Sequence, residues 1–336
     1  MLRKCNFCFV FLFFFSFYCN VFLQGQTVTL RIATVVPEGS TWVKSLQNLD
    51  KEIRRTMNIQ LIVYAGGTAG ESKAIMEKIK YGQLDGGGFI GSSLGEICPK
   101  IRIMDIPYQY HSLEEWKHVF KNIRSELVED FEKANFMVLG WGYGGFVDLY
   151  SKQPIRTLGD FQSAKIWFST GDPMMEAIFR ELKIQGIPLE TSAIFPALQT
   201  GLVNCVYNTP YGLMAIQWHT HVRYCTKYPI INPLGAVVIT KAAYEKIPAR
   251  FRNLFLRTCK KHFSTLGEDV EEKNIEAMKD LEERFKIQMI APDPAWLEET
   301  MRCGKKVGEE QIDKLYSKDF YHRVLKIQEE FRSKKK

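Results

Sequence analysis

The sequence lacks the cysteine spacings that build disulfide frameworks or zinc sites. Three of the eight cysteines fall within the first 25 residues, and the other five are widely scattered with no C-x-x-C pair. An odd and scattered set supports neither a disulfide scaffold nor a cysteine-based metal site. We therefore expect five buried free thiols in the folded part of the chain and no bound metal.

Concentrated positive charge is also scarce. The chain has 45 Lys and Arg against 38 Asp and Glu, a formal net charge of +7, and its one dense basic run is the terminal Lys334 to Lys336. Nucleic-acid binding needs a basic stripe or patch. We therefore expect no nucleic-acid partner.

Motifs for catalysis are missing as well. No Ser or Cys lies in a G-x-S-x-G elbow, and His219 and His221 are close in sequence without a neighbouring Asp, Glu or Cys to complete a metal site. GWGYGG (140–145) matches G-x-G-x-x-G, but the strand-like FVDLYS follows it instead of the helix that would hold a pyrophosphate. We expect that the protein binds no cofactor and is not an enzyme. We interpret these glycines as positions without a side chain that let the backbone cross between the lobes.

The first 25 residues are typical of a secretory signal peptide. They combine a basic start, a Phe-rich apolar run from Phe7 to Leu23 and a cleavage site near Gly25. The apolar run is short for a membrane anchor and contains polar residues. We expect export with cleavage; lipidation at Cys19 is an alternative that the bulky Tyr18 before it disfavours.

From residue 27 on, strand and helix patterns alternate. LRIATVV (30–36) and IQLIVYA (59–65) indicate strands, and the segment between them places its apolar residues on one helical face. The alternation returns after residue 165, which predicts two α/β lobes with helices covering the sheets. We assign 27–150, with later returning segments, to lobe I and 151–240 to lobe II. We expect 241–336 to form a hinge helix and C-terminal helices that pack on both lobes.

Open sheets bind ligands at the carboxyl ends of their strands, so the turns there should line a cleft between the lobes. AGGTAGESK (65–73) is one such turn. It fails the phosphate-loop pattern because Glu71 stands where the second glycine must be. We interpret it as a helix-capping turn that offers Thr68 or Ser72 as polar contacts.

Six segments in collinear order, from about Leu30 to Phe331, resemble the DctP-type solute-binding proteins of tripartite ATP-independent periplasmic (TRAP) transporters. They are VVPEGSTW, GQLDGG, DIPYQYHSLEE, LGWGYGGF, SAKIWFSTGDPMMEAIFRELK and PALQTGLVNCVYNTP. The resemblance implies a two-lobed periplasmic-binding-protein-like fold with an interdomain cleft, crossing strands and long C-terminal helices. It also implies a periplasmic protein that captures a small solute and hands it to membrane permease subunits without altering it.

Two arginines usually hold the carboxylate of the solute in the family that this chain resembles. Their positions read Trp167 and Val147 here, whereas Asn208 stands at the family's ligand-contacting asparagine. A carboxylate between Trp167 and Val147 would be desolvated without a cation. We therefore predict a largely apolar or lipid-like solute. The lost clamp also favours the subset of the family that works with a periplasmic tetratricopeptide-repeat protein.

The expected lining of the cleft is aromatic, since rings on facing lobes can enclose an apolar ligand. About half of these rings should instead pack in the core or between the lobes. The predicted contacts, besides Asn208, Val147 and Thr68, are Trp42, Phe89, Trp141, Tyr143, Trp167, Phe168, Tyr207 and Tyr211.

Three alternatives stay open. In the first, a cation such as Arg102 or Arg223 replaces the lost pair and the ligand is an organic carboxylate. In the second, the scaffold is an exported enzyme with His219, His221 or Asp172 as acid or base. In the third, an aromatic groove binds another polypeptide.

Overall fold

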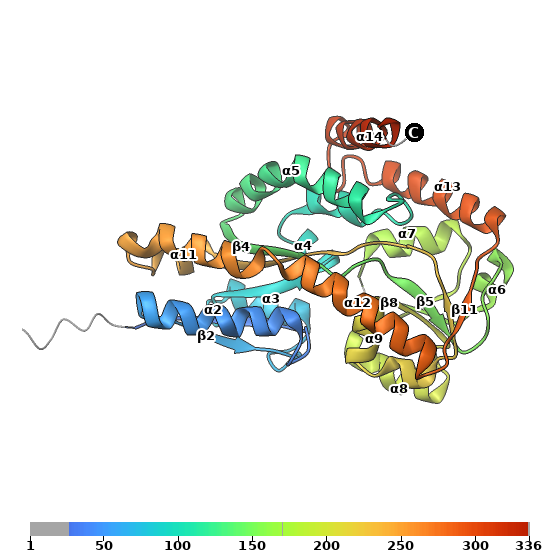
Figure 1. Cartoon of the computed structure of the whole chain (residues 1–336). Coiled ribbons are helices and arrows are strands. Elements are labelled where there is room, and N and C mark those ends of the chain that lie inside the picture. Colours follow the sequence, from blue (N-terminus) through green and yellow to red (C-terminus); the bar gives the residue numbers. More distant parts are fainter. Residues whose placement is uncertain (1–26, 170, 335–336) are drawn as a thin grey trace, which may run out of the picture.

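The computed structural model describes residues 27–169 and 171–334, so the expected signal peptide and Cys19 lie outside the described residues. Two α/β lobes lie side by side, and the long helix α12 runs from one to the other (Figure 1). Within the described ranges, no helix is both long and apolar enough to cross a membrane. The predicted two-lobed α/β class is confirmed.

Lobe I is built on a five-stranded sheet in the order β2-β1-β3-β10-β4, with β1 parallel to β2 and β3, and β10 antiparallel to β3 and β4. Its strands are β1 (Val28–Thr34), β2 (Ile59–Tyr64), β3 (Gly86–Ile90), β4 (Phe136–Tyr143) and β10 (Leu234–Thr240). Its helices are α2 (Thr41–Met57), α3 (Ser72–Lys80), α4 (Ser92–Gly95), η2 (Pro99–Asp105), α5 (Leu113–Lys133), α10 (Lys241–Glu245) and α11 (Ala249–Phe263).

Lobe II is built on a six-stranded sheet in the order β11-β9-β5-β8-β6-β7. Its strands are β5 (Asp148–Ser151), β6 (Ile166–Ser169), β7 (Gly186–Leu189), β8 (Cys205–Asn208), β9 (Tyr224–Thr226) and β11 (Gln288–Ile290). Its helices are α6 (Leu158–Ser163), α7 (Pro173–Glu181), η3 (Thr191–Ala193), α8 (Ile194–Thr200), α9 (Pro210–Ala215) and η4 (Trp218–His221). The sheet of lobe II thus begins at Asp148, and β10, although it lies within 151–240, returns to lobe I.

Local sequence explains how the helices begin and which face they bury. In α2 the Ser40 hydroxyl caps the helix by accepting from the Val43 N–H, and the apolar residues at helical spacing are buried. In α6 the side chains of Thr157 and Asp160 form a capping box. The five described cysteines are buried and free, as expected.

Two of the segments that cross between the lobes, one from β4 to β5 and one from β9 to β10, are hydrogen-bonded to each other. The Val147 N–H donates to the Ile231 carbonyl at 2.9 Å, and the Ile230 N–H donates back to the Val147 carbonyl at 3.2 Å. Gly145 has a φ of +86°, and a Cβ there would lie 2.6 Å from the Asn274 amide nitrogen. The glycines of GWGYGG therefore allow the crossing, as predicted.

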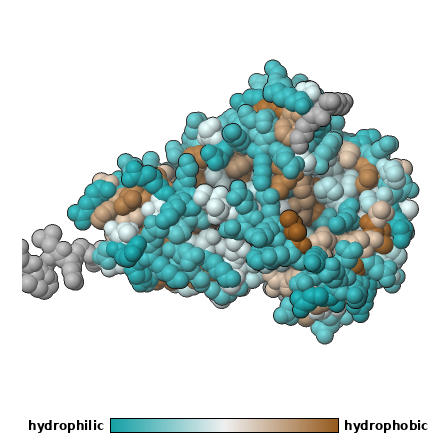
Figure 2. All heavy atoms as spheres, viewed as in Figure 1, coloured by the Kyte–Doolittle hydropathy of each residue, from teal (hydrophilic) through white to brown (hydrophobic). Residues whose placement is uncertain are grey.

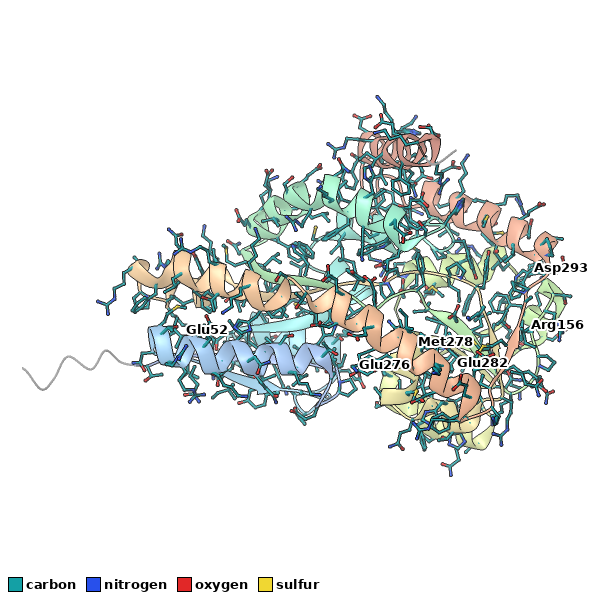
Figure 3. All side chains as sticks on the ribbon, viewed as in Figure 1. Glu52, Arg156, Glu276, Met278, Glu282 and Asp293 are labelled. Carbon is teal, nitrogen blue, oxygen red and sulfur yellow. The ribbon has the colours of Figure 1, made fainter. Side chains whose placement is uncertain are left out.

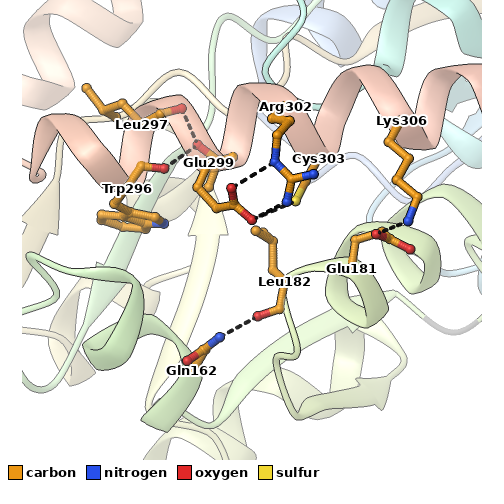
Figure 4. Close-up of polar contacts among 10 residues, drawn as sticks. Gln162, Glu181, Leu182, Trp296, Leu297, Glu299, Arg302, Cys303 and Lys306 are labelled. Carbon is orange, nitrogen blue, oxygen red and sulfur yellow. Dashed lines mark hydrogen bonds and ion pairs between the residues drawn. The ribbon is translucent and has the colours of Figure 1, made fainter.

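Three C-terminal helices complete the structure: α12 (Leu266–Glu283), α13 (Pro294–Glu310) and α14 (Lys318–Ser333). Helix α12 packs on α2 and β4 of lobe I and on α9 of lobe II, and α14 packs on α5. Helix α13 packs on α7, where Lys306 Nζ lies 2.6 Å from Glu181 Oε2 (Figure 4). At Gly304 it also approaches lobe I so closely that a Cβ would lie 2.0 Å from the Pro107 carbonyl oxygen. The C-terminal helices thus contact both lobes and limit how far they can separate.

Candidate functional site

A cavity of about 470 Å³ lies between the lobes. Lobe I contributes the N-terminus of α3, helix α4 and η2, through Glu71, Ser72, Lys73, Ser92, Ser93 and Arg102. Lobe II contributes the turn between β6 and α7 and the end of β7, through Ser169, Gly171, Pro173, Glu190 and Thr191. Hydroxyl groups and charges dominate, and none of the described residues that line this cavity is aromatic. The cavity is therefore suited to a polar solute.

Arg102 is the buried cation of this cavity, with a side chain that is 4% exposed. Its Nη1 lies 2.9 Å from Asp105 Oδ2, and its Nη2 lies 2.6 Å from Asp172 Oδ1. Burial alone would lower the pKa of Arg102, but attraction to Asp172 and Asp105 outweighs it and raises the pKa. Because Arg102 belongs to lobe I and Asp172 to lobe II, this ion pair links the lobes.

The two carboxylates beside Arg102 have different environments. Burial raises the pKa of Asp105 to about 6, although the Arg102 charge opposes the shift. Asp172 is the N-cap of α7 and accepts from the N–H groups of Met174 and Met175 at 3.1 and 3.4 Å. Asp172 therefore serves both as a helix cap and as the partner of Arg102.

The start of α3 offers a second polar wall. Glu71 is its N-cap residue, yet its side chain makes no capping hydrogen bond. The first N–H groups of α3 thus lack a side-chain cap beside the cavity, where an anion would be stabilised. Ser72, one of the two polar contacts predicted in this turn, lines the cavity, whereas Thr68 is exposed and its hydroxyl donates to the Ala65 carbonyl at 3.0 Å.

The structure places Trp167 in the core of lobe II. Its ring stacks on Tyr207 with centroids 5.0 Å apart and meets Trp218 edge-on, and its Nε1 donates to the Leu189 carbonyl at 2.9 Å. Phe168 packs edge-on against Phe179. Neither Trp167 nor Phe168 is among the residues that line the cavity, so their contact with a solute stays a prediction.

Five more of the predicted residues lie away from the interlobe cavity. Trp42, Phe89 and Val147 are buried in apolar clusters. Trp141 and Tyr143 line a different cavity of about 600 Å³ on lobe I, along β4 between α5 and α11. The interlobe cavity therefore does not bring these aromatic residues together.

Three predicted residues follow or end β8. Tyr207 is half-buried and close enough to Asp172 that this charge, added to burial, raises the pKa of its hydroxyl. Asn208 Oδ1 accepts from the Thr209 N–H at 2.8 Å, and the Tyr211 N–H donates to Asn274 Oδ1 of α12 at 3.0 Å. Their role as ligand contacts stays a prediction.

Of the two cations considered as replacements for the missing arginines, Arg102 lines the cavity, whereas Arg223 is exposed and outside it. The enzyme alternative invoked His219 and His221, which pack on Phe285 and Phe195 and do not line the cavity. Asp172 is engaged in the cap and ion pair described above. These positions offer no convergent acid and base.

The motif-based reasoning missed Glu71, Lys73 and Glu190 as contributors to the cavity. Glu71 and Lys73 lie where the turn after β2 leads into α3, and Glu190 directly follows β7. The rule that ligands bind beyond the carboxyl ends of strands indicated the turn at 65–73, from which only Thr68 and Ser72 were predicted as contacts, and the same rule applies to Glu190 after β7. The family motifs drew attention to Trp167 and Val147 instead.

Two α/β lobes that are joined by crossing segments and share a polar cavity define the class of two-lobed solute-binding proteins. Residues 32–315 match the family model described as bacterial extracellular solute-binding protein, family 7 (DctP), and the chain belongs to this family. A solute-binding protein of Sulfitobacter sp. (strain NAS-14.1) is 22% identical over 238 residues, which cover 69% of this chain and 72% of that protein.

Two solved structures of TRAP periplasmic solute-binding proteins have the same fold. One, from Haemophilus influenzae with bound L-gulonate, has a TM-score of 0.81 at 17% identity and covers 89% of this chain and 99% of its own. The other, from Pseudomonas putida F1 with bound D-glucuronate, has a TM-score of 0.79 at 22% identity and covers 88% and 96%. The predicted family is confirmed, and its members are binding proteins. The tetratricopeptide-repeat partner stays a prediction.

Proposed function

We propose that this protein binds a small polar organic acid in the interlobe cavity, in the periplasm, and delivers it to the membrane permease subunits of a TRAP transporter. The observation that carries the proposal is the buried guanidinium of Arg102 in the cavity wall. It supplies a cation in a chain that has lost both arginines of the family clamp. The solute is therefore an organic carboxylate held by a non-standard cation, and not the apolar molecule that the lost clamp suggested.

Arg102 retains capacity for a ligand after its internal contacts are counted. A guanidinium carries five N–H donors, and the hydrogen bonds to Asp105 and Asp172 use one each. Lys73, the Ser72 hydroxyl and the uncapped start of α3 add further groups that attract an anion. An apolar solute would instead strip water from all of these groups without replacing its hydrogen bonds.

Two relatives of the same fold support an acid as the solute. The similar structures from Haemophilus influenzae and Pseudomonas putida hold L-gulonate and D-glucuronate, respectively. Both ligands combine a carboxylate with several hydroxyl groups, which is the chemistry that the cavity of the present chain can satisfy. The transfer of ligand class from relatives of such low identity belongs to this proposal and rests on the polar lining found here.

Lys73→Met tests the proposal without disturbing the fold, because Lys73 is exposed and has no ion pair to another described residue. Thermal-shift assays and calorimetry should use L-gulonate, D-glucuronate and succinate, with decanoate as the apolar probe. At least one small acid should bind, and Lys73→Met should weaken it by about tenfold, the loss of one charge-assisted contact. Lys279→Met, on an exposed position of α12, is the control. Binding of decanoate with none of the small acids would contradict the proposal.

A further inference from the structure

The cavity carries more negative than positive charge. Lys73 and Arg102 are its two cations, whereas Glu71, Glu96 and Glu190 line it, and Asp105 and Asp172 lie directly on Arg102. Two positive and five negative side chains give a net formal charge of −3. A binding site for a simple acid would be expected to carry the opposite sign.

Two of these carboxylates, Glu71 and Glu190, stand at the starts of helices without capping them. Glu71 and Glu190 occupy the N-cap positions of α3 and η3, and neither side chain bonds the first N–H groups of its helix. Neither forms an ion pair with another residue in the described ranges. Glu71 belongs to lobe I and Glu190 to lobe II, so each lobe presents at least one carboxylate without an ion pair to the same cavity.

The charge of Arg102 is already balanced by Asp105 and Asp172, so a bound carboxylate adds a further negative charge to the enclosed space. Enclosing Glu71 and Glu190 around a ligand also removes water from two carboxylates, which is unfavourable unless a positive group replaces it. A positive group on the ligand offsets both effects, because it pairs with these carboxylates while the acid group of the ligand contacts Arg102 or Lys73.

We infer that the solute is zwitterionic, a small acid that also bears an ammonium group. This inference rests on the proposed function and deepens it, because it names the class of acid. The carboxylate end contacts Arg102 or Lys73, and the ammonium end contacts Glu71 of lobe I and Glu190 of lobe II. A ligand held from both lobes in this way also favours their closure.

Matched ligand pairs test the inference in the full mature chain. The probes are succinate with L-aspartate, glutarate with L-glutamate, and D-gluconate with D-glucosaminate, each pair differing by one ammonium group. In at least one pair the amino member should bind with a dissociation constant at least about tenfold lower by calorimetry. Mass spectrometry of the solute retained by protein purified without added ligand should likewise show an amine.

Charge-neutral variants identify the residues responsible. Glu71→Gln and Glu190→Gln, singly and together, should weaken binding of the amino member by about tenfold or more each and leave binding of its plain acid unchanged or stronger. Glu282→Gln, at an exposed position of α12 outside the cavity, is the matched control (Figure 3).

The outcomes separate the two proposals. If plain acids bind as tightly as their amino partners, or if the double variant keeps the preference for the ammonium group, the zwitterion inference fails and the proposed function stands. If no member of either series binds, both fail together.

Discussion

Asp172 of lobe II contacts Arg102 of lobe I, and the unfolding free energy of the variant Asp172→Asn shows how much this contact stabilises the protein. Asn caps helices as well as Asp does, so Asp172→Asn keeps the bonds to the N–H groups of Met174 and Met175 and removes the charge from the 2.6 Å contact with Arg102. Arg102 is 4% exposed, so water replaces the lost carboxylate only poorly. The variant should therefore be less stable than the wild type.

The magnitude follows from what remains around Arg102. Removal of one partner of a buried ion pair costs about 3–5 kcal/mol when the other charge is left alone. Asp105 still contacts Arg102, so the expected loss is about 2 kcal/mol of unfolding free energy, as for one hydrogen bond to a charged group. Asp172→Ala also removes the cap of α7 and should lose about 1 kcal/mol more.

Urea unfolding followed by circular dichroism measures both variants, and small-angle X-ray scattering of the ligand-free protein reports whether the lobes separate. Asp293→Asn is the matched control, because Asp293 also caps a helix directly before a proline, is exposed and has no ion pair within the described ranges (Figure 3). It should change stability little. If Asp172→Asn is no less stable than Asp293→Asn, the contact with Arg102 does not hold the lobes together and the reasoning is refuted.

Two further predictions concern buried groups of lobe II. Burial raises the pKa of Asp148 to about 6 despite the Tyr228 N–H and Lys227, so ionisation of Asp148 disfavours the folded state as the pH rises from about 4 to about 6. Asp148→Asn keeps the hydrogen-bond acceptor for Tyr228, and relative to this variant the wild type should lose unfolding free energy as the pH rises over this window. If the difference in unfolding free energy between the two proteins does not change with pH, the charge of Asp148 is not buried. Trp167→Ala should destabilise the protein by about 3–5 kcal/mol in urea unfolding, because removal of a packed ring leaves a cavity. The stability of Trp167→Phe should lie between those of the wild type and Trp167→Ala. A loss below about 1 kcal/mol for Trp167→Ala would show that the ring is not part of the core.

Several features of the fold could be predicted from local sequence. Alternating apolar residues in LRIATVV and helical spacing after it indicate a strand and a helix without reference to any other part of the chain, and β1 and α2 form there. The order of such segments, together with the motifs around them, was enough to predict two α/β lobes, the crossing at GWGYGG and the family.

The candidate site could be predicted only in fragments. Ser72, Arg102 and Asp172 each attracted attention, the first as a turn residue, the second as a replacement cation and the third as an acid. Nothing local indicated that Arg102 and Asp172, which are 70 residues apart, form a contact across the lobes. The motif position of the missing arginine instead drew attention to Trp167, whose ring packs against Tyr207 and Trp218 inside lobe II.

Local sequence patterns were therefore sufficient to predict the elements and their order, because periodicity, caps and motifs act over a few neighbouring residues. Through the family resemblance they also predicted Trp167 and Val147 in place of the usual arginine pair. Which side chains share the interlobe space follows only from the packing of the two lobes. The burial of Arg102, its ion pair with Asp172 and the presence of Glu71 and Glu190 along one cavity depend on how the two lobes approach each other. The polarity of that cavity, on which the proposed class of solute rests, is a property of this approach, which no single segment of the chain contains.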